Sequence, residues 1–268
     1  MNFKMPKREQ ISNKGTFGKV LNICGSDKYI GAAYLSTISS LKVGAGLSAL
    51  ASTHKVIGSV STMLPEAIYL SYKDSLKKLN TFNVILIGCG LGLSLCSQNI
   101  FTKVLRRLQK ETKPVVIDAD GLNLLSKKYQ RLPQNCIITP HLLEASRLLK
   151  CSIEEVQADL ELAAKKLTQK YECITVLKSH RTVICDTNLN TYINKNGNSS
   201  LAKAGTGDVL AGIIAGLLAQ KMDNFEAAKL GVYLHSRTAE ILSEKYTEYS
   251  ILASDLVMNL NLAIKECV

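Results

Sequence analysis

A glycine-rich stretch at residues 196–208 is the first part of the sequence whose residue types could do chemistry. Gly205, Thr206, Gly207 and Asp208 stand directly before an apolar run that predicts a helix. Glycines let the backbone turn sharply, and a helix that begins there offers unpaired N–H groups and the positive end of its dipole. Helix starts of this kind bind anions, phosphates above all. The stretch therefore predicts a phosphate site.

Asp208 falls in the first turn of this predicted helix. A carboxylate beside a bound phosphate can take a proton from a hydroxyl that attacks the phosphorus atom. The alternative is that Asp208 only caps the helix, which is a common role for aspartate. Taken alone, the stretch predicts either a catalytic base or a helix cap.

Polar residues also follow a series of short apolar runs, at 19–23, 83–87, 114–117 and 136–138. These runs predict buried strands, and helical periods follow them, as in βαβ units. The sequence therefore predicts a mostly parallel sheet, and ligands of such sheets bind at the carboxyl ends of the strands. The polar and glycine residues expected at that edge are Gly90, Gly92, Asp118, Asp120, Asn123, His141 and Glu144.

The glycines at 88, 90 and 92 raise a second interpretation, a dinucleotide-binding Rossmann unit. That pattern needs GxGxxG in the first unit and an acidic residue about 20 positions later. Asp118 comes after a further strand, so the pattern is incomplete.

The second half of the chain predicts a helix over 152–170 that opens with a capping box of Ser152 and Glu155. Three short strands are predicted over 173–178, 182–185 and 190–194. The turn between the first two of these strands carries the cations Lys178 and Arg181, which are either phosphate ligands or solvated side chains. Helices are predicted over 226–243 and 250–264.

The composition limits the class of protein. The chain has 268 residues, 46% of them hydrophobic and 21% charged, and a formal net charge of +11. The basic residues are scattered and form no zinc-finger or aromatic–basic pattern, so we expect a nucleotide ligand and no nucleic acid. No apolar run approaches the roughly 20 residues of a membrane span. Eight cysteines without a CxxC pair, behind a polar first segment, predict a cytoplasmic protein.

Eight motifs spread over residues 14–260 carry a family resemblance. They are KGTFGKVLNICGS (14–26), GAA (31–33), GCGLG (88–92), VIDADGLNLL (116–125), TPHLLEASRLL (139–149), KSHRT (178–182), GNSSLAKAGTGDVLAGIIAGLLAQ (197–220) and ASDL (253–256). With them the chain resembles the ADP- or ATP-dependent NAD(P)H-hydrate dehydratases of the ribokinase-like superfamily. GTGD is shared with many small-molecule kinases, whereas DADGLNLL and TPHLLEASRLL at this spacing are much more specific.

The resemblance implies a three-layer α/β/α fold with a mostly parallel central sheet, in a single domain over 1–268 without the epimerase domain of some bacterial members. It implies an enzyme that phosphorylates the ring hydroxyl of the hydrated cofactors NADHX and NADPHX, with Mg²⁺ and ADP or ATP. Loss of phosphate then restores NADH or NADPH. The family also implies a homo-oligomer, typically a tetramer.

The family's roles carry over motif by motif. Asp208 would contact the hydrate and act as base, and Gly205, Thr206 and Gly207 would form the anion hole. The other implied positions are Ala32, Gly90 and His141 for the substrate, Lys178, Ser179, His180, Arg181, Thr182 and Gly207 for the nucleotide, and Asn123 and Glu144 for the metal or phosphate region.

The sequence departs from the family pattern at three places. Cys89 stands where the family usually has proline, and Ser179 stands where it usually has glycine. The first glycine loop, GSDKYIGAA, is less glycine-rich than is common. None of these changes removes the proposed base, but Ser179 could alter the affinity for the nucleotide.

Two other functions stay open from the sequence. One is a ribokinase-like kinase for a hydroxyethylthiazole, a pyrimidine or a sugar alcohol, which would use the same GTGD loop. The other is a nucleotide-binding regulator without activity, against which an intact Asp208 argues because binding alone needs no base.

Overall fold

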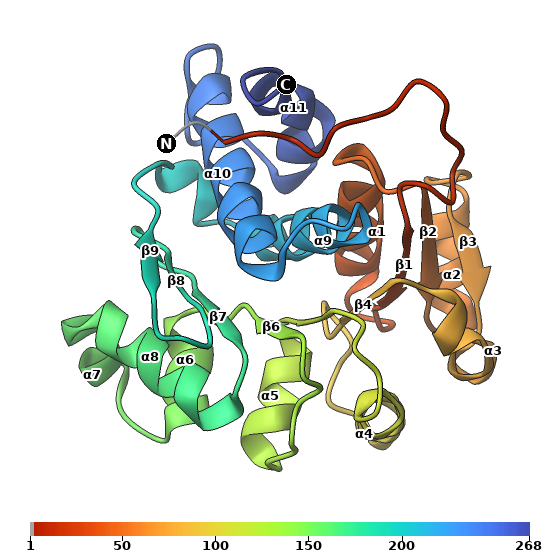
Figure 1. Cartoon of the computed structure of the whole chain (residues 1–268), viewed down its shortest axis with the longest axis horizontal. Coiled ribbons are helices and arrows are strands. Elements are labelled where there is room, and N and C mark those ends of the chain that lie inside the picture. The colour runs from red at the N-terminus through yellow and green to blue at the C-terminus, as the bar shows by residue number, and fades with distance from the viewer. Residues whose placement is uncertain (1–2) are drawn as a thin grey trace.

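The computed structural model describes residues 3–268, in which helices and strands alternate along most of the chain (Figure 1). The strands are β1 (Lys19–Ile23), β2 (Leu47–Ala51), β3 (Ile68–Leu70), β4 (Val84–Ile87), β5 (Val115–Ile117), β6 (Cys136–Ile138), β7 (Ile174–Leu177), β8 (Val183–Cys185) and β9 (Thr191–Ile193). The α-helices are α1 (Ile30–Lys42), α2 (His54–Ser61), α3 (Tyr72–Lys78), α4 (Leu95–Leu108), α5 (Asp120–Lys127), α6 (Leu142–Leu149), α7 (Ile153–Ala158), α8 (Leu160–Tyr171), α9 (Thr206–Ala219), α10 (Asn224–Ser243) and α11 (Ala253–Lys265).

The strands form one sheet in the order β3-β2-β1-β4-β5-β6-β7-β8-β9. The first seven in this order run parallel, and β8 and β9 are antiparallel to their neighbours. The chain builds β1, β2 and β3 toward one edge and then returns to place β4 on the other side of β1. The strand order therefore reverses between β1 and β4, and the carboxyl ends of strands at such a point are where ligands of these sheets bind. The loops after the two strands lie against each other, since the Gly25 N–H donates to the Cys89 carbonyl and the Ser26 hydroxyl donates to the Gly90 carbonyl, both at 2.8 Å.

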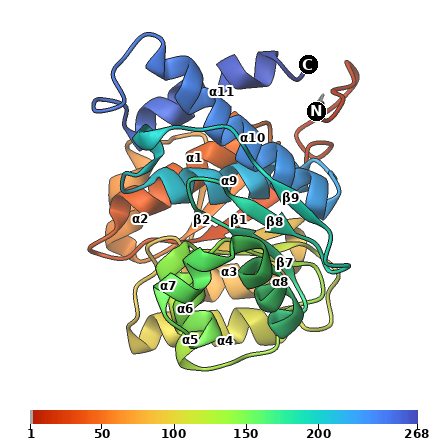
Figure 2. The same ribbon diagram turned by 90° about the vertical axis from the view of Figure 1, so that its left-hand side faces the viewer.

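Helices cover both faces of the sheet, so the fold has three layers (Figure 2). Alternate residues of a strand point to opposite faces. In β4, Val84 and Leu86 join the core under α1, α2, α9, α10 and α11, and Ile85 and Ile87 join the core on the opposite face, which α3 to α8 cover. Both faces are apolar, as parallel sheets require. The predicted three-layer α/β/α architecture with a mostly parallel sheet is confirmed.

Helix α9 is the most enclosed helix of its layer, with twelve of its fourteen residues buried. It packs closely on α1 through Gly212 and Gly216. A Cβ atom at Gly212 would lie 2.3 Å from the Ser36 carbonyl oxygen, and one at Gly216 would lie 2.3 Å from Cγ1 of Val43. These glycines let the backbones of α1 and α9 approach closely, and this contact fixes the position of the first turn of α9.

Two predictions about local structure were wrong. The helix expected over 152–170 is two helices, because Asp159 is extended (φ −148°, ψ 93°) and its side chain caps α8 by accepting from the Leu162 N–H at 2.9 Å. The capping box of Ser152 and Glu155 is confirmed at the start of α7. The helix or two predicted within residues 54–80 are present as α2 and α3, and the segment also contains β3. The helix expected to begin at residue 100 begins at 95, where the Ser94 side chain caps it.

Within residues 3–268, the helices are too short or too polar for any of them to cross a lipid bilayer.

Candidate functional site

The first turn of α9 presents free backbone donors at the carboxyl end of the sheet. Gly205 is the N-cap residue, and its left-handed backbone (φ 92°, ψ −18°) turns the chain into the helix. Among the described residues, the N–H groups of Gly207 and Asp208 have no hydrogen-bond acceptor, whereas the Thr206 N–H donates to the Lys203 carbonyl at 3.4 Å and the Val209 N–H donates to the Gly205 carbonyl at 3.1 Å. The free N–H groups expected at the start of this helix are therefore present, and their binding of an anion stays a prediction.

Asp208 does not cap this helix. The N-cap position belongs to Gly205, and no side chain makes a capping hydrogen bond there. Burial raises the pKa of Asp208 to about 7, and the nearby charge of Asp118 adds to the effect. Catalytic bases have pKa values near the working pH, which burial and neighbouring charges bring about. Of the two roles open from the sequence, the structure is compatible with the base.

Asp118 directly follows β5 and is hydrogen-bonded to residues that follow two other strands of the sheet. Its Oδ1 atom accepts hydrogen bonds from Nζ of Lys178 at 2.6 Å and from the Thr139 hydroxyl at 2.7 Å. Burial alone would lower the pKa of Lys178, but the charges of Asp118 and Glu144 outweigh it and raise that pKa above its usual range. The residues after β5, β6 and β7 thus form one buried ion pair with a hydroxyl donor.

The Lys178–Asp118 pair was not predicted. Both residues were expected at the strand ends, but Lys178 was assigned only to the nucleotide. It lies against the anion loop as well, because a Cβ atom on Gly207 would be 3.3 Å from its Nζ. The lysine ammonium therefore lies beside both the free N–H groups and Asp118.

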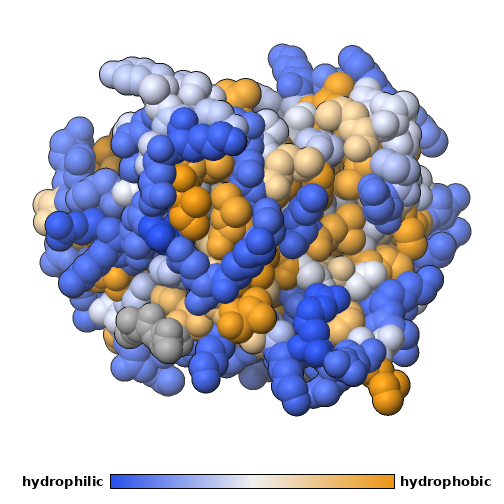
Figure 3. Space-filling model, turned by 90° about the horizontal axis from the view of Figure 1, so that it is seen from above, coloured by the Kyte–Doolittle hydropathy of each residue, from blue (hydrophilic) through white to orange (hydrophobic). Residues whose placement is uncertain are grey.

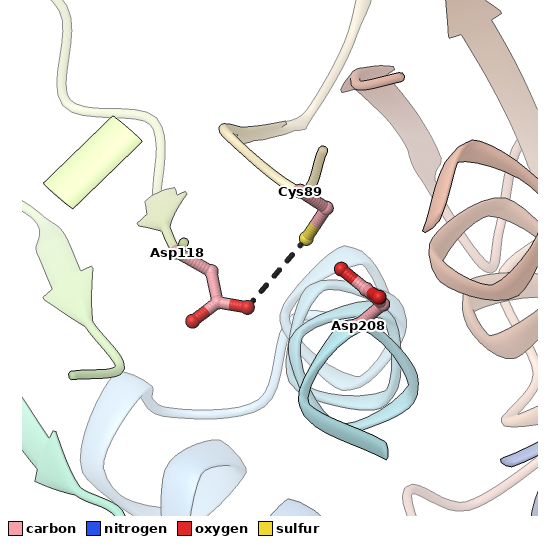
Figure 4. A group of neighbouring side chains, drawn as sticks. All are labelled: Cys89, Asp118 and Asp208. Atoms are coloured by element: carbon pink, nitrogen blue, oxygen red, sulfur yellow. Dashed lines mark hydrogen bonds between the residues drawn. The ribbon is translucent and has the colours of Figure 1, made fainter. Parts of the chain in front are cut away.

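Cys89 completes the group around Asp208 (Figure 4). Its Sγ is 3.7 Å from Oδ2 of Asp118, and one ligand atom each from Cys89, Asp118 and Asp208 lie within 4.8 Å of one another. The donor set does not fit Mg²⁺ held by protein alone. Magnesium prefers oxygen ligands, whereas one donor here is a thiol and Asp118 is already neutralised by Lys178.

His141 and Glu144 form a reciprocal cap at the start of α6. Nδ1 of His141 accepts from the Leu143 and Glu144 N–H groups at 3.2 and 3.3 Å, and Oε2 of Glu144 accepts from the His141 N–H at 2.9 Å. Burial raises the pKa of Glu144 to about 7. Burial and the charge of Lys178 lower the pKa of His141. This cap positions both residues beside Lys178.

Asn123 belongs to a polar chain below the loop after β4. Its amide nitrogen donates to Asp120 at 3.4 Å, and its oxygen accepts from Arg147 at 2.8 Å. The other oxygen of Asp120 accepts from the Gly92 N–H at 2.8 Å. Arg147 could not be assigned from the sequence, although it stands in the TPHLLEASRLL motif. The metal-supporting role of Asn123 and Glu144 stays a prediction.

On the β1–β4 side, the structure brings together two of the predicted substrate residues. Gly90 has a left-handed backbone (φ 59°), and a Cβ atom on it would lie 2.7 Å from Cβ of Ala32. Only glycine allows the loop after β4 to lie this close to the start of α1. This contact lies at the carboxyl ends of β1 and β4, where the strand order reverses.

On the β7 side, a pocket of about 380 Å³ opens next to the ion pair. The residues that line it are His141, Leu142, Leu143, Ile153, Gln157, Leu160, Lys178, Ser179 and His180. Three predicted nucleotide residues are among them. Arg181 and Thr182 are not, and they instead close the turn on Ser179, whose hydroxyl accepts from the Arg181 N–H at 3.2 Å. His141, predicted to contact the substrate, lies on this side of the site.

Comparison with known proteins agrees with this arrangement. A family model described as NAD(P)H-hydrate dehydratase matches residues 20–261. The ADP-dependent (S)-NAD(P)H-hydrate dehydratase of Neisseria meningitidis is 37% identical over 88% of this chain and 81% of its own length. The bifunctional NAD(P)H-hydrate repair enzyme of Coxiella burnetii is 38% identical over 97% of this chain. The chain spans about half (53%) of that longer relative.

A solved structure has the same fold. The ADP/ATP-dependent NAD(P)H-hydrate dehydratase from Bacillus subtilis, co-crystallised with ATP and Mg²⁺, superposes with a TM-score of 0.90 at 30% sequence identity. The match covers 99% of this chain and 95% of that one. The ribokinase-like fold predicted from the motifs is confirmed.

Proposed function

Because this chain belongs to the NAD(P)H-hydrate dehydratase family, we propose that it repairs hydrated nicotinamide cofactors at the site around Asp208. In this proposal the substrate is NADHX or NADPHX, and ADP or ATP donates a phosphoryl group to its ring hydroxyl. The observation that carries the proposal is the position of Asp208. It lies in the first turn of α9, where among residues 3–268 the N–H groups of Gly207 and Asp208 have no acceptor, and it lies near Lys178, which lines the pocket.

The reaction needs a base and a set of hydrogen-bond donors and cations that stabilise negative charge. Asp208 takes the proton of the ring hydroxyl while the hydroxyl oxygen attacks the terminal phosphorus atom of the nucleotide. The N–H groups of Gly207 and Asp208 and the Lys178 ammonium stabilise the charge on the transferred phosphoryl group. Phosphoryl transfer depends mostly on such positioning and electrostatics.

Phosphorylation turns a poor leaving group into a good one. The carbon–oxygen bond to the phosphate then breaks, a proton leaves the neighbouring ring carbon, and the double bond of the dihydronicotinamide forms between the two carbons. The products are NADH or NADPH, inorganic phosphate and the shortened nucleotide. We assign Mg²⁺ to the phosphate oxygens of the incoming nucleotide, where it would neutralise charge.

The two ligands would approach Asp208 from opposite sides. The pocket at Lys178, Ser179 and His180 suits the nucleotide because Lys178 supplies a cation for its phosphates and the leucine and isoleucine side chains of the lining supply an apolar surface. The hydrated dinucleotide would contact Ala32 and Gly90, because these residues meet at the point where the strand order reverses. His141 lines the pocket, so we propose that it contacts the substrate only where the two ligands meet.

The test is to incubate the protein with NADHX and Mg²⁺ and to supply ADP and ATP in separate reactions. We expect the near-ultraviolet absorbance of NADH to return with at least one nucleotide, and one inorganic phosphate to appear per NADH. Phosphorylation of a hydroxyethylthiazole, a pyrimidine or a sugar alcohol, without recovery of NADH, would instead establish the small-molecule kinase.

We also propose that residues 1–268 form one domain and that the protein is a cytoplasmic homo-oligomer, a tetramer as the family resemblance implies. All eight cysteines are free, as in a reducing compartment. Apolar side chains are exposed around the start of α11, where Tyr249 is 94%, Leu252 56% and Met258 56% exposed. Figure 3 looks onto this layer and shows hydrophobic side chains between polar ones. Light scattering after gel filtration measures the oligomeric state.

A further inference from the structure

The thiol of Cys89 lies between the two carboxylates at the centre of the site (Figure 4). Its Sγ is 3.7 Å from Oδ2 of Asp118, a distance at which a thiol donates a hydrogen bond. The nearest oxygen of Asp208 is within 4.8 Å of the same sulfur atom. The Cys89 side chain is fully buried, which shields it from bulk solvent. The thiol donates its proton to Asp118, and Asp208 is the second carboxylate near the same sulfur atom.

The two carboxylates differ in their need for this donor. Asp118 already accepts from Lys178 and from the Thr139 hydroxyl through Oδ1. Asp208 has no ion-pair partner among residues 3–268, and burial penalises its charged form. A hydrogen bond from the Cys89 thiol favours ionised Asp208 and opposes that penalty. A hydrogen bond from the thiol therefore stabilises the charged form of Asp208 more than that of Asp118.

The backbone holds the thiol in this position. Gly88 (φ 124°) packs so tightly that a Cβ atom on it would lie 2.0 Å from the Asp118 carbonyl oxygen. Gly90 on the other side is also left-handed, and the Cys89 carbonyl accepts from the Gly25 N–H at 2.8 Å. The chain at residue 89 is thus fixed between β1 and β5, with its side chain beside the two carboxylates and the thiol of Cys24.

We propose that Cys89 is a positioning residue whose thiol hydrogen-bonds Asp208 while that carboxylate acts as base and hydrogen-bonds Asp118 once Asp208 holds the substrate proton. This inference rests on the function proposed above. The S–H bond stays intact throughout, and only its acceptor changes. The thiol favours the ionised form of Asp208, and it separates the two carboxylates when both are charged.

The charged and titratable groups that face Asp208 come from four elements. They are Cys89 after β4, Asp118 after β5, Asp120 at the start of α5 and Lys178 after β7. Of these, Asp118 and Asp120 disfavour ionised Asp208, and Lys178 and Cys89 favour it. Loss of the thiol therefore raises the pH that Asp208 needs to act as a base.

The test compares the pH dependence of kcat in Cys89→Ala, Cys89→Ser and the wild type. We expect the acid limb of Cys89→Ala to move up by about half to one pH unit, the shift that a net hydrogen bond corresponds to. Activity well above the limb should stay close to that of the wild type. Cys89→Ser keeps a donor and should restore the limb. Cys136→Ala removes a buried thiol from the neighbouring part of the sheet and should not move it.

A second readout needs no activity. The S–H stretching band of Cys89, isolated by subtracting the infrared spectrum of Cys89→Ala, should shift as Asp208 titrates, and the shift should be absent in Asp208→Asn. An unmoved acid limb in Cys89→Ala, or an S–H band that ignores the state of Asp208, would overturn the proposal. A responsive band in a protein that does not convert NADHX would support the thiol contact and reject the proposed function.

Discussion

Replacing Lys178 with methionine should have one of the largest effects on stability in the site. Nζ of Lys178 is 2.6 Å from Oδ1 of Asp118, and the two side chains are only 17% and 2% exposed. Methionine keeps most of the apolar stem and removes the charge. Asp118 is then left buried with only the Thr139 hydroxyl and the Cys89 thiol as side-chain donors.

Breaking a buried ion pair by removing one partner costs about 3–5 kcal/mol, since an uncompensated charge remains. We expect Lys178→Met to lose that much of the free energy of unfolding at neutral pH, measured by urea denaturation and circular dichroism. The folded-state pKa of Lys178 lies above the ordinary 10.5, so its stabilisation is complete below that pH and is lost as the pH rises further. The difference in the free energy of unfolding between Lys178→Met and the wild type should therefore shrink only above about pH 10.5.

A double variant separates charge from packing. Lys178→Met with Asp118→Asn removes both charges and should recover more than half of the lost stability, without recovering activity. Lys195→Met, at an exposed position, serves as the control and should change stability by less than about 0.5 kcal/mol. The reasoning is refuted if Lys178→Met loses less than about 1 kcal/mol, or if the double variant is no more stable than the single one.

The other predictions concern the loops and the pH dependence. Gly88→Ala places a Cβ atom 2.0 Å from a carbonyl oxygen at φ 124° and should cost at least about 3 kcal/mol or prevent folding. Gly58→Ala, which has open space around it in a helix, should stabilise by about 0.5–1 kcal/mol, and thermal melts compare the two. Lys203→Met removes hydrogen bonds of 2.6, 2.7 and 3.3 Å to carbonyls in the loop 248–251 and should lose about 2 kcal/mol of stability in urea. Asp208 must be ionised to act as a base, and its pKa is about 7, so kcat should fall roughly tenfold per pH unit well below pH 7. Initial rates at saturating substrate measure this fall, which would be absent if another group were the base.

Strands with strong local signals could be predicted from the sequence. The run at 83–87 contains β4 (Val84–Ile87), because a parallel strand that is buried on both faces is a continuous apolar run. Strand β3 was missed because it has three residues at the sheet edge, and Ile68 in it is 44% exposed. The break between α7 and α8 at Asp159 was not predicted, because the apolar residues keep a helical spacing across it.

The site could be predicted residue by residue but not as a set of contacts. Asp118 and Lys178 were both placed at strand ends, yet their pairing depends on the sheet order that puts β6 between β5 and β7. Cys89 was noticed only as a departure from the family pattern. Its contact with Asp118, 29 residues away, depends on the left-handed backbones of the neighbouring glycines. Contacts of this kind follow from topology and backbone strain, which no local pattern encodes.

The central claim is that Asp208 takes the proton of the ring hydroxyl, and Asp208→Asn tests it most directly. The measurement compares the rate of NADH formation from NADHX in the variant and the wild type, alongside the dissociation constant of the nucleotide by calorimetry. We predict a rate loss of about 10²–10⁴-fold, the contribution of a general base, with nucleotide affinity nearly unchanged. Turnover close to that of the wild type in Asp208→Asn would contradict the account.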